Sequence, residues 1–332
     1  MFRTNYHSSV TTIACTFLLT GWMTLPVLAA TENEVLTEAE LAQEAPPIFG
    51  LGWLDQTQFI ASTSANSMAN RLDRFFGVQR SDIEAAYSAL RLTTIQSWND
   101  IDGFENAVRL RGKVYLPRIN ERISLIFSEE DGDGTSYFTQ NAASISQQET
   151  TRVNLEVDLA EEDAHHLYFR VGVRSGLKGR VSMRYRFEPE SAGNTANRFT
   201  QSVYFKDGKG FGSFSRYQID HVISDAGLLR WTNDLRFEET YTGAEYTTSL
   251  EYLTLRSNQT AVSWYGRANG ETSPDYIVSY DLGFRLRKNI YREWLFMEIE
   301  PGYTWRKEAF NLAREGTPYV FFRLEMAIGT FN

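Results

Sequence analysis

The sequence predicts an all-β fold, a closed antiparallel transmembrane β-barrel of about 14 strands (12 is the next best count) with a short N-terminal helix. Three observations predict it. Apolar and polar residues alternate in segment after segment from residue 86 onward, and a strand sends alternate side chains to opposite faces. Aromatic residues make up 14% of a chain whose mean hydropathy is −0.37. The N-terminus has the composition of a secretory signal.

Residues 1–30 are predicted to be a cleaved signal peptide. One charge, Arg3, precedes the apolar stretch IACTFLLTGWMTLPVL, and small residues follow where a signal peptidase would cut. A retained membrane anchor is the alternative, but the apolar stretch is short for a spanning helix. Cys15 would leave with the signal, so the mature chain would have neither disulfides nor a thiolate metal site. Its net charge of about −10 argues against a nucleic-acid partner.

Residues 31–85 are predicted to be a periplasmic segment. It begins as an acidic tether that ends in APPIFG, and it contains a helix at 55–76. Met68, Leu72, Phe75 and Phe76 fall at helical spacing on one side of that helix. We expect the helix to cover the barrel mouth; a plug that enters the lumen is the alternative.

Residues 86–332 are predicted to form the barrel. A soluble sandwich would also alternate, but about fourteen strands with continuous apolar faces are most simply accommodated by closure, which removes the sheet edges. The predicted strands lie near 86–97, 104–116, 121–130, 149–158, 165–175, 177–188, 197–206, 211–223, 227–238, 242–255, 259–269, 275–288, 292–305 and 318–331.

The connections and the aromatic residues support a membrane barrel over a sandwich. If the first strand runs outward, most long connections, such as EDGDGTSYFTQNAASISQQE, SWNDIDGFEN, RANGETSPD and RKEAFNLAREGTP, lie outside. Trp98 and Trp305 would lie near the outer ends of strands, and Trp231, Tyr291 and Trp294 near the inner ends. Two aromatic girdles are expected at the two lipid interfaces.

The chain resembles bacterial outer-membrane β-barrel proteins in having a signal peptide, a periplasmic preamble and then strands almost to the last residue. The segment NRLDRFFGVQRSDIEAAYSALRL, followed by VRLRGKVYLPRINERISL, is similar to an uncharacterised proteobacterial outer-membrane β-barrel (porin-like) family. This resemblance covers most of the mature chain and implies the fold and location, but no known activity. One departure is that Phe331 shares a face with Arg323 and Asn332 is last, where such barrels usually end on an outward aromatic residue; a bulge would restore the phase.

Charged residues on the predicted lumen side are the candidate functional residues. They are sorted by sign, with basic residues on the second, fifth and sixth strands and acidic ones on the fourth, tenth and thirteenth. Facing rows of opposite charge give channels their selectivity. The pore-lining candidates are Arg109, Arg111, Lys113, Glu156, Asp158, Arg170, Arg174, Arg184, Arg186, Glu245, Glu251, Glu298, Glu300, Arg323 and Glu325.

The function expected from these features is passive diffusion of small polar solutes across the bacterial outer membrane. Two alternatives remain open: a structural or assembly barrel with a filled lumen, and a lipid-modifying outer-membrane enzyme. Expected partners are the outer-membrane lipids, lipopolysaccharide, the barrel assembly machinery and small polar solutes. Basic residues at outer strand ends, including Lys206 and Lys209, are candidates for pairing with lipopolysaccharide phosphates.

No enzyme activity, metal or cofactor is expected. His165 and His166 lie beside carboxylates, but adjacent residues of a strand point to opposite faces and cannot easily share a metal. His221 follows Asp220 at another predicted inner strand end, and no Gly-x-Ser-x-Gly motif is present. The acidic stretch EEDGDGTS lacks the glycine spacing of a helical calcium loop and is interpreted as a solvated loop.

Overall fold

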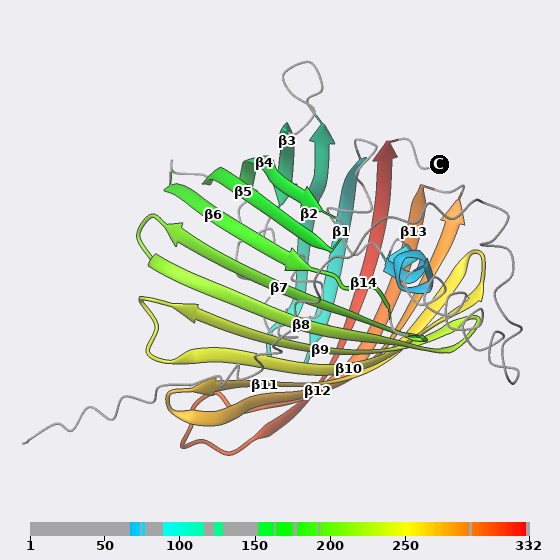
Figure 1. Cartoon of the computed structure of the whole chain (residues 1–332). Helices are drawn as coiled ribbons and strands as arrows, with labels where there is room; N and C mark the ends of the chain where they lie inside the picture. Colours follow the sequence, from blue (N-terminus) through cyan, green and yellow to red (C-terminus); the bar gives the residue numbers. More distant parts are fainter. Residues whose placement is uncertain are drawn as a thin grey trace, which may run out of the picture. The chain divides into compact units, whose positions relative to one another are not determined.

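The alternating segments pair into one closed antiparallel sheet in the computed structural model of the chain (Figure 1). The structure describes residues 67–73, 75–76, 89–115, 123–128, 152–162, 164–174, 178–191, 193–291 and 294–329. The chain divides into two units, residues 1–49 and 50–332, and all described residues belong to the second. The predicted signal peptide and acidic tether therefore lie outside the described residues.

Fourteen strands follow one another around the barrel in sequence order. They are β1 (Ala89–Asn99), β2 (Gly103–Tyr115), β3 (Ile123–Ser128), β4 (Arg152–Glu162), β5 (His165–Arg174), β6 (Lys178–Phe187), β7 (Thr195–Lys206), β8 (Gly210–Ser224), β9 (Gly227–Glu238), β10 (Ala244–Ser257), β11 (Thr260–Thr272), β12 (Asp275–Tyr291), β13 (Leu295–Arg306) and β14 (Glu315–Gly329).

The barrel closes by pairing its first and last strands. β1 pairs with β14 over its whole length, from Ala89 opposite Gly329 to Asn99 opposite Tyr319. Every strand therefore has two neighbours, and no edge is left to pair with another chain. The predicted fold class and strand number are confirmed, and each predicted strand matches an observed one with ends shifted by a few residues.

Two connections expected to be long are in fact short. β1 and β2 are joined by residues 100–102, and β11 and β12 by residues 273–274. The expectation was wrong because backbone pairing continues through the polar residues at the strand ends, such as Gly103 with Asn99 and Asp275 with Thr272. The predicted long connection near residues 129–151 and the terminal residues Phe331 and Asn332 lie outside the described residues.

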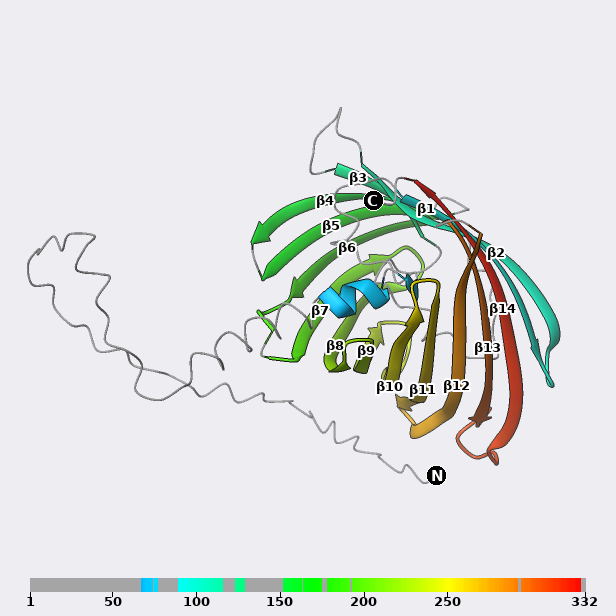
Figure 2. The ribbon, with the colours of Figure 1, turned by 90° about the vertical axis from the view of Figure 1, so that its right-hand side faces the viewer.

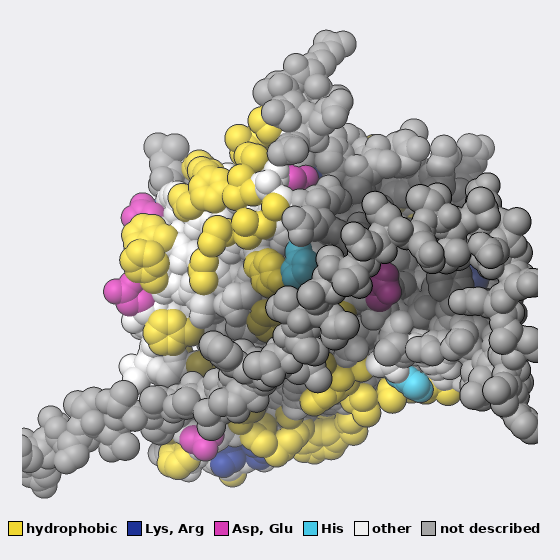
Figure 3. Space-filling view, in the orientation of Figure 1, with side chains coloured by type: hydrophobic (Ala, Val, Ile, Leu, Met, Phe, Trp, Pro, Cys, Tyr) yellow, Lys and Arg dark blue, Asp and Glu magenta, His cyan; other side chains and the backbone are white. Residues whose placement is uncertain are grey.

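The two faces of the sheet separate apolar from charged side chains. On β6, Val181 and Met183 are exposed on the outside, while Arg180 and Arg184 are buried on the inside. Large hydrophobic side chains are exposed on nearly every described strand, and Figure 3 shows them as broad yellow patches among few charged groups. This inverted arrangement, with apolar side chains outside and charged side chains inside, is typical of a barrel surrounded by lipid.

The last strand follows the predicted pattern. Phe322 and Ile328 of β14 are exposed on the outer face, and Arg323 and Glu325 are buried on the inner face. The outward tryptophans also lie where expected: Trp98 and Trp305 stand one residue from the ends of β1 and β13, and Trp231 lies near the start of β9, toward the opposite end.

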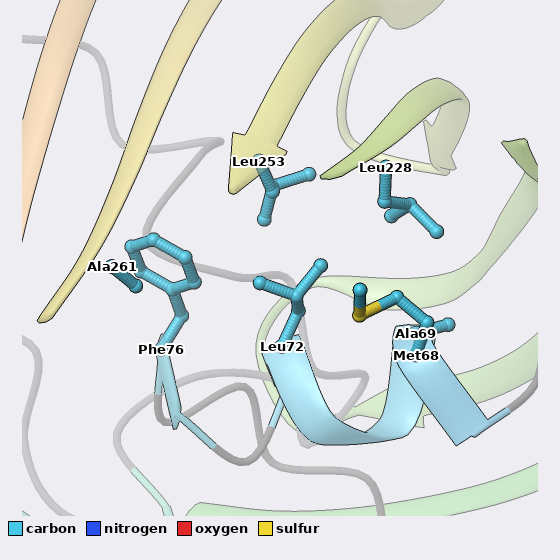
Figure 4. Packing of buried hydrophobic residues seen from close by; sticks show 7 residues of the cluster. All are labelled: Met68, Ala69, Leu72, Phe76, Leu228, Leu253 and Ala261. Carbon is cyan, nitrogen blue, oxygen red and sulfur yellow. The ribbon is translucent and has the colours of Figure 1, made fainter. Parts of the chain in front are cut away.

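A helix formed by residues 67–73 and 75–76 lies inside the barrel (Figure 2). Its residues Met68, Ala69, Leu72 and Phe76 are buried against an apolar cluster on the inner wall, close to where β9 begins and β10 ends (Figure 4). The wall residues of this cluster are Leu228, Leu253 and Ala261. The helix thus enters the lumen just inside the mouth instead of only covering it. The reason is that the inner wall is apolar at this point, whereas most of its other inward-facing residues are charged. The predicted first part of the helix, 55–66, lies outside the described residues.

Candidate functional site

The inner wall of the barrel is lined with charge. Among the described strand residues, twelve basic and eight acidic side chains are buried, and the strand registers place all of them on the inner face. The chain as a whole carries a net charge of −9. The buried strand residues of the inner face that the structure describes therefore carry a net positive charge, opposite in sign to that of the whole chain.

One continuous ion-pair network crosses β12, β13, β14 and β1. Arg323 lies between two carboxylates of β13, with its Nη1 2.6 Å from Glu298 Oε1 and 2.5 Å from Glu300 Oε2. Arg287 Nη2 is 2.6 Å from Glu325 Oε1, and the Arg91 Nη1 atom is 2.7 Å from the same oxygen. Because acidic and basic side chains alternate across the strands, each charge is compensated by neighbours on both sides.

Two tyrosines extend this network across the inner wall. The Tyr265 hydroxyl donates a short hydrogen bond to Glu300 and lies 2.9 Å from the Tyr319 hydroxyl. Each ring lies against a glycine of the neighbouring strand, where an added Cβ would be 2.3 Å from the ring of Tyr265 at Gly283 or of Tyr319 at Gly302. Any larger residue at these two glycines would displace the tyrosine and the hydrogen bonds that it makes.

The opposite wall is richer in basic residues. Glu156 of β4 is buried between Lys113, whose Nζ is 3.0 Å from Glu156 Oε1, and Arg170, which makes a short ion pair with Glu156 Oε2. The neighbouring strand β6 adds Arg180, Arg184 and Arg186, all buried on the inner face. Arg184 Nε donates to the Ser202 hydroxyl at 3.4 Å.

A third ionic cluster joins the helix to the wall. Arg230 of β9 donates to both carboxylate oxygens of Asp220, at 2.7 and 2.9 Å, and its Nη1 is 2.5 Å from Asp73 Oδ1 on the helix. Arg71 of the helix also donates to Asn258 Oδ1 at 3.3 Å. The helix is therefore held by a buried charge pair as well as by the apolar cluster.

Most predicted pore-lining residues lie inside the barrel. Arg111 and Asp158 are half-buried, Glu245 is exposed at a strand end, and the backbone of Arg174 is described but its side chain is not. The remaining candidates are buried on the inner face: Arg109, Lys113, Glu156, Arg170, Arg184, Arg186, Glu251, Glu298, Glu300, Arg323 and Glu325.

The sequence pattern did not single out Arg285 and Arg287, although they complete the network of β13 and β14. Their spacing of two residues in FRLRK is the same signal that marked Arg109 and Arg111. Arg230, Asp220 and Asp73 were also missed. No periodicity within one segment links a helix residue to a strand more than 150 positions later in the chain.

The mouth at the other end of the barrel, away from the helix, carries two pockets of different charge. One, of about 190 Å³, is lined by Lys178, Arg180, Lys206 and Lys209 together with Asp207. The other, of about 130 Å³, includes Asp234, Glu245, Glu271 and Arg236. At its rim, partial desolvation and then the carboxylate of Glu271 raise the pKa of Tyr241 above the ordinary tyrosine value.

The histidines do not converge on a reactive centre. His165 accepts or donates a hydrogen bond with the Tyr185 hydroxyl at 2.7 Å and stacks on Phe187, while His166 stacks on Tyr168. His221 lies 2.8 Å from the Thr195 hydroxyl. Within the described ranges, no group of three or more His, Cys, Asp or Glu side chains is placed to hold a metal ion.

In the described part of the chain, no helix combines the length and apolar character needed to cross a membrane.

A scan of known protein families and a search of curated proteins both find no match. Among solved structures, the chain is similar to a KdgM porin in complex with disordered oligogalacturonate (7% identity, TM-score 0.38, 73% of this chain and 99% of that one).

It is also similar to an anion-selective porin from Comamonas acidovorans, with 7% identity, a TM-score of 0.45 and coverage of 73% of this chain and 99% of that one. The outer membrane channel DcaP of Acinetobacter baumannii has 8% identity, a TM-score of 0.45 and coverage of 73% and 96%.

Proposed function

We propose that this protein is a passive diffusion channel for small polar solutes in the bacterial outer membrane, and that it is not an enzyme. The observation that carries the proposal is the inversion of the barrel: its outer face is apolar, and its inner face is charged on almost every described strand. A polar solute crossing the membrane could exchange water for these charged groups, whereas the lipid-facing side offers it nothing.

The outer membrane is the location that this architecture favours. Closed β-barrels satisfy all backbone hydrogen bonds between strands, so they can cross a bilayer without a helix. The expected signal peptide would deliver the chain across the inner membrane first. Lipopolysaccharide and the barrel assembly machinery remain proposed partners, because they follow from the location.

The lumen of the proposed channel is partly occupied. The helix lies in the lumen near one end, and the β12–β14 network draws long arginine side chains across the wall. The excess of buried basic over buried acidic side chains on the strands predicts a preference for anions. Displacement of the helix from its site would widen the path open to solutes.

A second candidate function, a structural or assembly barrel with a filled lumen, is favoured by one observation. Arg285, Arg287 and Glu298 are only 1–2% exposed, so water has almost no access to these inward side chains. A permanently open lumen would leave these three side chains more exposed to water. The two candidates differ in whether the helix and the ion pairs rearrange when the barrel is in a membrane.

Ion conductance separates them. The purified, cleaved chain would be inserted in a planar bilayer with a tenfold KCl gradient, beside a variant lacking residues 55–76. Discrete current steps with a reversal potential of the anion-selective sign are expected, with larger steps for the deletion variant. A silent membrane for both proteins, despite verified insertion, would overturn the channel proposal and leave the filled barrel.

A further inference from the structure

The basic pocket at the mouth away from the helix has the features of an anion site. It lies between the end of β5, the beginning of β6 and the β7–β8 turn. Its volume of about 190 Å³ is roughly that of six water molecules in the liquid. An oxyanion with part of its hydration shell fits such a space.

Positive charge dominates this pocket. Lys178, Arg180, Lys206 and Lys209 line it, against the single lining carboxylate of Asp207. One further carboxylate, Glu238 of β9, makes a short ion pair with Lys206 and lies 3.5 Å from Lys209. Among the residues that the structure describes, four basic groups thus face two acidic ones, a net positive charge.

Two of the residues that line the pocket are glycines with open space beside them. Gly208 adopts a left-handed backbone with φ +81°, and the nearest atom to a Cβ added there would be the Lys178 ammonium at 3.8 Å. At Gly179 an added Cβ would meet nothing within 4 Å. The ammonium group of Lys178 therefore lies beside a turn residue that has no side chain, which leaves room for an anion next to it.

The pocket faces the lumen and not the surrounding lipid. Arg180 is opposite Lys206 on β7 and Gly172 on β5, and all three lie on the inner face. Further along the same face of β6 stand Arg184 and Arg186. An anion released from the pocket into the barrel would meet the next basic groups of the same strand.

From this arrangement we propose that the pocket binds soluble oxyanions, of the phosphate or carboxylate class, at the channel mouth. The site extends the proposed diffusion function by naming the class of solute that the channel concentrates. Bidentate and charge-assisted hydrogen bonds from arginine and lysine are the usual means of holding such groups.

Binding can be measured without any transport. Inorganic pyrophosphate would be titrated calorimetrically into the folded, detergent-solubilised barrel at low ionic strength, where exposed charges are least screened. The variant K178Q/K209Q should bind about tenfold more weakly or worse, because two charge-assisted contacts are lost. Both lysines are exposed, so the substitutions leave the fold intact.

The control is Lys307→Gln, which removes one positive charge from the same end of the barrel but from the β13–β14 connection. It should bind pyrophosphate as the unmodified chain does. No measurable binding by the unmodified chain, or equal loss in the control, overturns the proposed site. Because the titration requires no current, this outcome is distinguishable from a failure of the channel proposal.

Phosphates of lipopolysaccharide are the other source of the same chemistry. The titration would be repeated in nanodiscs with and without lipopolysaccharide, and equal affinities are expected because the pocket opens to the lumen. A weaker affinity only in the presence of lipopolysaccharide would assign the pocket to lipid phosphates and overturn its role for soluble anions.

Discussion

Leu72→Ala should loosen the helix in the lumen and raise the conductance of the barrel. Leu72 is fully buried, at 0% exposure, between the helix and the wall residues Leu228 and Leu253 (Figure 4). Alanine favours helix formation at least as well as leucine, so the substitution acts on docking and not on the helix itself.

The magnitude follows from the burial of this side chain. Truncating a buried leucine to alanine costs about 2–5 kcal/mol, through lost transfer free energy and the cavity left behind. If docking bears this cost, the ratio of docked to undocked helix falls by roughly 30-fold to a few thousandfold, since about 1.4 kcal/mol is a factor of ten. The ion pair between Asp73 and Arg230 remains in the variant and limits the effect.

Single-channel recording measures the change as a higher open probability or a larger unitary step. The control is Leu250→Ala, which removes the same atoms from β10 but on its exposed outer face. Retention of the barrel would be checked by its heat-modifiable migration in detergent gels. If Leu72→Ala conducts no better than the control while both remain folded, the helix is not what limits the current.

Three further results are expected. Arg323→Leu should lower the unfolding free energy in detergent by about 3–5 kcal/mol, because Glu298 and Glu300 each lose an ion-pair partner. Lys288→Gln, at an exposed position, should change the unfolding free energy little. Similar losses of unfolding free energy for both variants would refute a stabilising role of the ion-pair network. Leu282→Arg, at an exposed outer position in the middle of β12, should cost about 2–4 kcal/mol of folding free energy in lipid vesicles, against about 0–1 for Phe104→Arg near a strand end. A cost independent of depth would contradict the lipid-facing assignment. Arg184→Gln should shift the reversal potential in a KCl gradient toward cation selectivity, and an unchanged potential would exclude this arginine from the conducting path.

The strands were predictable because their signal is local. In RVSMRYRF, every second residue is apolar, and a sheet with one apolar and one charged face can only produce that pattern. The same periodicity placed Arg323, Glu298 and Glu156 on the inner face without any knowledge of their partners.

What could not be predicted is which charges meet. Arg287 reaches Glu325 across 38 positions of sequence, and Asp73 reaches Arg230 across 157. Such pairs depend on the stagger of the whole barrel, which is set by the sum of all registers around it and not by any one segment. The position of the helix inside the mouth depends in the same way on apolar wall residues, Leu228 and Leu253, that lie near the ends of otherwise polar inner rows.

The lumenal helix also constrains the order in which the protein can assemble. It precedes every strand in the sequence, yet its wall partners belong to β9, β10 and β11. The helix therefore has no complete surface on which to dock until β9, β10 and β11 have paired. Once β1 has paired with β14, the closed barrel surrounds the helix, and the helix can leave only through an open end of the barrel. Placing the helix in the lumen is therefore simplest if the N-terminal segment reaches the inner side of the sheet before β1 pairs with β14.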